Sequence, residues 1–185
     1  MTQIALETTD PGAVVERATA RVLELAQTWL AWDGRPRLSE GGDRIYTPHK
    51  VVRRYADHLI DHLAEIEARL AGEPTRPDGW HASLVTLDSD WARFTEADLV
   101  EATERLTRLS TTFRLRLRAA GEPEWDRDRG AGVWTLRQVA EHVGSPWYAE
   151  QLGDLSAGCR LRTGRGTARR RPSWPGRRSG TGRRR

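Results

Sequence analysis

Helical periodicity, interrupted at intervals by residues that start and stop helices, is the feature that most restricts the fold of this chain. Apolar residues recur at the spacing of an amphipathic α-helix in four segments, at about residues 11–31, 48–71, 96–120 and 135–153. Alternating patterns, which indicate strands, are almost absent. Amphipathic helices bury their apolar faces most simply against one another. The sequence therefore predicts an all-α fold, a four-helix bundle.

Residues with capping chemistry mark where these helices begin. The first two segments open with a capping side chain followed by proline, at Asp10 and Thr47. Thr95 and Thr135 are expected to cap the other two, the latter with the spacing of a capping box. Pro146 lies inside the fourth segment, where it removes one helical hydrogen bond and predicts a kink.

Aromatic residues also mark the connections. The long stretch 72–94 contains Trp80, His81 and Trp91, and its length predicts that it packs over one end of the bundle. Trp134 directly precedes the capped start of the fourth segment, so we interpret it as a hydrophobic staple.

Charge divides the chain into a body and a tail. Residues 156–185 hold 11 of the 30 basic residues and no acid, so residues 1–155 carry 19 basic and 26 acidic side chains, a net charge of −7. The tail has no apolar periodicity and is expected to be disordered. The predicted domains are therefore a bundle over 1–155 and a basic tail over 156–185. The tail is either the product of a frameshift in GC-rich DNA or a genuine arginine-rich arm that binds nucleic acid through its phosphates.

Other features favour a cytoplasmic protein. Cys159 is the only cysteine, which excludes an internal disulfide and a multi-cysteine zinc site. The first residues lack the basic start of a signal peptide, and no apolar run is long enough for a membrane span. We expect a small-molecule substrate and no membrane partner. The sequence leaves open whether the chain is a homodimer.

The histidines provide the most specific chemical hypothesis. His58 and His62 are four residues apart on the second helix, so they project from the same face, where two imidazoles can share a metal ion. His142 flanks the apolar stripe of the fourth segment and is the expected third ligand. His81 is a reserve ligand in the long connection, and His49 is interpreted as a surface residue.

A simpler interpretation of the same histidines stays open. They could be interfacial residues bonded to nearby carboxylates, which are Asp57, Asp61, Glu65 and Glu141. If a metal is bound, Asp61 or Glu141 is expected to orient the ligand imidazoles as a hydrogen-bond acceptor.

Two motifs resemble the DinB-like family of four-helix bundles. The run from Trp134 to Ala149 is similar to an element in which Trp-Ser/Thr precedes a helical histidine. The stretch from His58 to Ile66 is similar to the second element, HxxxH followed by an apolar helix, although the two elements occur here in the reverse of the usual order. The resemblance implies a divalent metal, zinc or nickel, bound by His58, His62 and His142. It also implies thiol-dependent transferase or isomerase activity with mycothiol, bacillithiol or glutathione.

The chemistry expected of such a site follows from its open coordination. Three neutral imidazoles leave at least one position free, as in catalytic sites. A low-molecular-weight thiol bound there would become a thiolate, the competent nucleophile. The predicted reaction is thiol transfer to a small electrophile or thiol-assisted isomerisation, and no general base is identified. The alternatives are metal-dependent hydrolysis and a non-catalytic bundle that binds a partner or ligand.

Overall fold

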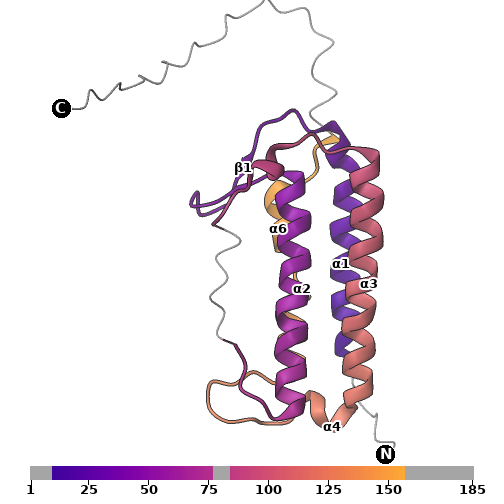
Figure 1. Ribbon diagram of the computed structural model, residues 1–185, viewed down its shortest axis with the longest axis vertical. Helices are drawn as coiled ribbons and strands as arrows, with labels where there is room; N and C mark the ends of the chain where they lie inside the picture. Colours follow the sequence, from indigo (N-terminus) through magenta and orange to yellow (C-terminus); the bar gives the residue numbers. More distant parts are fainter. Residues whose placement is uncertain (1–9, 77–83, 157–185) are drawn as a thin grey trace, which may run out of the picture.

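Four packed helices form the body of the protein, as the sequence predicts. The computed structural model describes residues 10–76 and 84–156. The four helices are α1 (Pro11–Thr28), α2 (Pro48–Ala71), α3 (Glu96–Ala120) and α5 (Leu136–Val143). Helix α1 packs against α3 and α5, and α2 packs against the same two helices, so the four close into a ring. Figure 1 shows α1, α2 and α3 as long helices standing side by side.

Short elements connect these helices. A 3₁₀ turn, η1 (Trp29–Ala31), ends α1, and two short antiparallel strands, β1 (Arg37–Leu38) and β2 (Ile45–Tyr46), precede α2. Leu38 pairs with Ile45, and Arg37 pairs with Tyr46. The remaining elements are η3 (Asp88–Trp91), α4 (Glu122–Trp125) and α6 (Trp147–Leu152). None of the helices in the described ranges combines the length and apolar character that crossing a membrane requires.

The predicted caps are present at all four helix starts. The Asp10 carboxylate accepts a hydrogen bond from the Gly12 amide at 2.9 Å, and the Thr47 hydroxyl accepts one from the Lys50 amide at 3.3 Å. Thr95 and Thr135 each form a capping box with the residue three positions on. These bonds satisfy amide groups that have no partner within the helix, so local side chains mark the four helix starts.

The fourth segment differs from its prediction, because it is two helices rather than one kinked helix. Helix α5 ends at Val143 and α6 begins at Trp147, with Pro146 as the residue before its first turn. A Cβ on Gly144 would lie 2.4 Å from Cγ1 of Val14 on α1. The chain therefore stops its helix where it comes closest to α1, and the proline, which lacks an amide hydrogen, starts the next helix.

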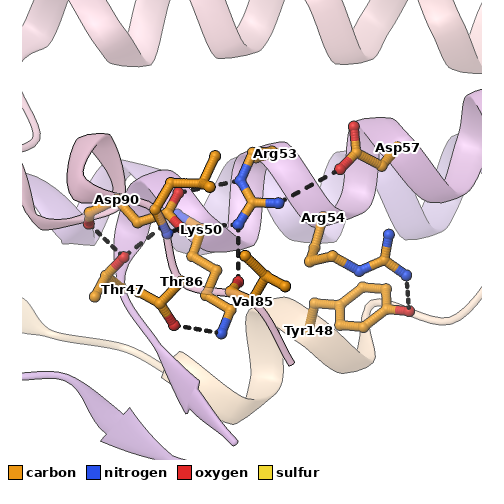
Figure 2. Close-up of polar contacts among 10 residues, drawn as sticks. Thr47, Lys50, Arg53, Arg54, Asp57, Val85, Thr86, Asp90 and Tyr148 are labelled. Carbon is orange, nitrogen blue, oxygen red and sulfur yellow. Dashed lines mark hydrogen bonds and ion pairs between the residues drawn. The ribbon is translucent and has the colours of Figure 1, made fainter. Parts of the chain in front are cut away.

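The described part of the long connection, residues 84–94, is held against the first half of α2 by polar contacts (Figure 2). Asp90 is almost fully buried and accepts two hydrogen bonds from Arg53, at 3.1 and 2.7 Å. The Thr47 hydroxyl donates to the Asp90 carbonyl at 2.6 Å. The Lys50 ammonium is buried and donates to Thr86 at 2.9 Å, and this burial lowers its pKa. This described part of the connection therefore packs at the end of the bundle where α2 begins.

Candidate metal centre

His58 and His62 lie one turn apart on α2 and face the same side. Their ring centroids are 4.7 Å apart, with an interplanar angle of 87°. His62 is buried, and His58 is partly buried. Leu59 and Ile66 on the same helix are fully enclosed in the core, and this fixes the rotation of α2 about its axis. The helix therefore presents both imidazoles along the edge of its buried face.

His142 reaches the same point from α5. Its ring centroid lies 4.9 Å from that of His58 and 5.1 Å from that of His62. Leu136, Val139 and Val143 anchor α5 in the core, so the more exposed face of the helix carries His142 toward α2. One ligand nitrogen from each of the three imidazoles lies within 4.8 Å of the others. The structure thus brings together the three histidines that the sequence selected.

The three imidazoles are spaced closely enough to bind a divalent ion, and His58 also has the protonation state that such an ion needs. Metal–nitrogen distances of about 2.0–2.1 Å separate tetrahedral ligand nitrogens by about 3.4 Å. Small rotations of the imidazoles would close the remaining gap. Burial, assisted by the two neighbouring imidazoles and the Arg54 guanidinium, lowers the pKa of His58 to about 3. His58 is therefore neutral near pH 7, the form that binds metals.

A carboxylate is bonded to the back of His62. Nδ1 of His62 lies 2.6 Å from Oε2 of Glu65, and Nε of Arg69 donates to Oε1 of Glu65 at 3.0 Å. The hydrogen bond with His62, assisted by Arg69, lowers the pKa of Glu65 to about 2. Because a carboxylate accepts hydrogen bonds, a neutral His62 carries its proton on Nδ1 and leaves Nε2 free as a metal ligand.

The role of acceptor that the sequence assigns to Asp61 or Glu141 stays a prediction. Asp61 is partly buried and lines a cavity beside the histidines, and Glu141 lies exposed on α5. The carboxylate that contacts His62 is Glu65, which the sequence analysis named only among the nearby acids. Glu65 lies three residues after His62 and four before Arg69, so all three share one helix face. This spacing is the signal that could have identified Glu65 from the sequence.

An open cavity of about 530 Å³ adjoins the histidines. His62, His142 and Trp134 contribute to its wall, together with Asp61 and Arg76. The Trp134 ring centroid lies 4.8 Å from that of His142 and 6.5 Å from that of His62, to which the ring is nearly parallel. Trp134 is exposed, and its ring lies against those of the two histidines.

Tyr148 and Arg54 flank the other side of the cluster. The Tyr148 ring stands perpendicular to His58, with centroids 5.6 Å apart. Nη2 of the buried Arg54 donates to the Tyr148 hydroxyl at 3.1 Å, and the guanidinium lies over the ring (Figure 2). Sequence reasoning missed both residues, because α6 reaches α2 only through the break before Trp147. The histidine cluster is thus enclosed on one side and open on the other.

His49 does not contribute to this cluster. His49 is partly buried rather than on the surface, and its Nε2 lies 3.4 Å from the Arg93 carbonyl and 3.8 Å from Asp98. His81, the reserve ligand, and residues 157–185 of the tail lie outside the described residues. Within the described ranges, the three-histidine group is the one set of His, Cys, Asp and Glu side chains arranged to hold a metal ion.

Comparison of the chain with protein-family models, curated proteins and solved structures finds no match.

Proposed function

We propose that this protein is a divalent-metal enzyme in which His58, His62 and His142 bind zinc or nickel. One observation carries the proposal: three imidazoles from two helices converge beside an open cavity. A closed structural site surrounds its metal with four protein ligands, whereas three ligands beside a cavity leave a position for substrate. When bound, the ion would lower the pKa of a coordinated water or thiol.

We further propose that the reaction is thiol-dependent transfer or isomerisation on a small electrophile, as in the DinB-like family. The two sequence elements that resemble this family supply the three histidines. The cavity volume of about 530 Å³ falls in the range of small-molecule sites. Mycothiol or a similar low-molecular-weight thiol is the proposed second reactant.

The chain's own residues have distinct roles in this proposal. Glu65 orients His62 through Nδ1, so that Nε2 faces the metal position. The indole of Trp134 forms an apolar wall that excludes water from one side of the cavity. Arg54 and Tyr148 fix His58 from the enclosed side, because the tyrosine ring packs on the imidazole and the arginine holds its hydroxyl.

Metal analysis of the full chain, purified without an affinity tag, tests the first proposal. We expect close to one zinc or nickel ion per chain, and a loss of most of it in His62→Ala and His142→Ala. His49→Ala is the matched control, because His49 lies on α2 outside the cluster. A parent chain with only traces of metal, or equal content in all variants, would reject the site.

An assay of the metal-loaded protein on small electrophiles, with and without thiol, tests the second proposal. Thiol-dependent turnover that is lost in His62→Ala is the expected result. Turnover without thiol would indicate metal-assisted hydrolysis instead. Stoichiometric metal without any turnover would favour the non-catalytic alternative.

A further inference from the structure

A continuous set of polar contacts links the candidate metal ligand His62 to the loop that carries Trp134. Glu65 uses one carboxylate oxygen for His62 and the other for Arg69. The Arg69 guanidinium uses Nε and Nη2 for Glu65, and its Nη1 donates to the Trp134 carbonyl at 2.8 Å. His62, Glu65 and Arg69 lie at positions i, i+3 and i+7 of α2, so they follow one face of the helix.

Both charged members of this link are well shielded from solvent. The side chains of Glu65 and Arg69 are 20% and 10% exposed. The orientation and charge of a shielded carboxylate depend strongly on its hydrogen-bond partners, because little water is present to replace a lost bond. The planar guanidinium suits a residue that must hold a carboxylate and a carbonyl at the same time, which a lysine ammonium does less well. A change at His62 should therefore affect the position of the Trp134 loop, and a change in that loop should affect His62.

The loop at the far end has the backbone freedom to respond. Residues 126–135 connect α4 to α5, and Gly130 and Gly132 adopt positive φ angles of 105° and 77°. Such angles favour glycine, which allows a wide range of conformations. Most side chains in this loop are exposed, so few packing contacts restrain it. The Arg69 bond at Trp134 fixes the loop directly before α5, the helix that carries His142.

We propose that Glu65 and Arg69 are positioning residues that couple metal binding at His62 to the placement of the Trp134 loop. The inference rests on the proposed metal site and extends it, because neither residue needs to touch the metal. Glu65 sets the orientation of the His62 ring. Arg69 binds both Glu65 and the Trp134 carbonyl, so it couples that orientation to the wall of the cavity and to the start of α5. Binding of the metal then orders the loop, and loss of the link weakens metal binding.

Zinc affinity of the full chain, measured by competition with a chromophoric chelator, tests the coupling. Glu65→Gln should weaken zinc binding about 10–100-fold, the range typical of residues that orient metal ligands. Arg69→Met should weaken it by about tenfold, and Arg69→Lys should regain part of that loss because it restores one charged contact. Glu67→Gln is the matched control, since Glu67 pairs with Arg116 on another face of α2 and should change affinity less than about twofold.

Hydrogen exchange provides a readout that does not depend on affinity. Saturating zinc should slow deuterium uptake in residues 128–135 of the parent and of Glu67→Gln, but not of Arg69→Met. If the parent fails to bind zinc, the metal site and the coupling are both rejected. If the parent binds zinc but Glu65→Gln binds it as tightly as Glu67→Gln does, or if zinc slows uptake equally in Arg69→Met, only the coupling is overturned.

Discussion

The close approach of Gly144 to α1 gives a quantitative test of how the fold places the third histidine. In Gly144→Ala the new Cβ would lie 2.4 Å from Cγ1 of Val14 and 2.9 Å from the Ala140 carbonyl oxygen. Ordinary carbon–carbon contacts lie at about 3.5–4.0 Å, so α1 and the end of α5 must separate by about 1 Å. Overpacking of this kind destabilises by about 1–3 kcal/mol.

Part of this loss is offset by the unfolded state. The φ of Gly144 is −71°, which alanine adopts freely, so the substitution removes about 0.4–1 kcal/mol of unfolded-chain entropy. We therefore expect a net loss of about 1–2 kcal/mol. For a domain of this size that corresponds to a fall in Tm of about 2–8 °C. Urea denaturation and thermal melting followed by circular dichroism measure the change.

Two controls separate the contact from a general effect of alanine. Gly41→Ala should be nearly neutral, because its Cβ would meet only the Asp43 side chain, at 3.3 Å. Val14→Ala removes the opposing methyl groups, so the double variant with Gly144→Ala should recover part of the loss, a coupling of about 0.5–1.5 kcal/mol. A Gly144→Ala protein as stable as the parent, or losses that simply add in the double variant, would refute the reasoning.

Two further predictions concern the polar contacts between α2 and residues 84–94. Burial lowers the pKa of Lys50, so between that pKa and the unfolded value of 10.5 the unfolded chain binds more protons, and stability rises with pH. In urea titrations, the unfolding free energy of the parent relative to that of Lys50→Met should therefore rise from pH 7 to pH 10. A constant difference would show that Lys50 titrates alike in both states. Asp90→Asn removes the charge that holds Arg53 and should cost about 2–4 kcal/mol. The exposed Glu104→Gln should cost less than about 0.5 kcal/mol in the same denaturation experiment.

Helix boundaries could be predicted because their signals are local. The hydroxyl of Thr47 caps the helix that begins one residue later, and the Thr95 box closes within four residues. The break at Gly144 could not be predicted in the same way, because it depends on the distance to Val14, 130 positions earlier in the chain. Periodicity alone continues through residues 144–146, so sequence favoured one kinked helix where tertiary contact produces two.

In the candidate site, too, the features set by local helix geometry could be predicted and those set by tertiary contacts could not. The pairing of His58 with His62 follows from helix geometry, whereas their meeting with His142 is a tertiary event that the apolar stripes only suggested. Four carboxylates were near the histidines in sequence, and the choice of Glu65 depends on side-chain orientation and on Arg69. The position of the Trp134 ring could not be predicted either, because one of its two ring neighbours, His62, lies on another helix.

In the proposed metal site, His142 as the third ligand links metal affinity to the contacts that hold α5 against the rest of the bundle. Helix α5 has eight residues, too few to be stable alone in water. The capping box at Thr135 and the Arg69 bond at Trp134 fix its start, and the Gly144 approach to α1 fixes its end. His142 keeps its distance to α2 only while these contacts persist, whereas the distance between His58 and His62 is kept in any intact α2.

Metal bound by all three histidines must then favour the folded state, by about 2.7 kcal/mol at a free metal concentration of 100 Kd. By the same linkage, Gly144→Ala should lower zinc affinity as well as Tm, whereas Asp90→Asn, which acts far from α5, should lower Tm alone.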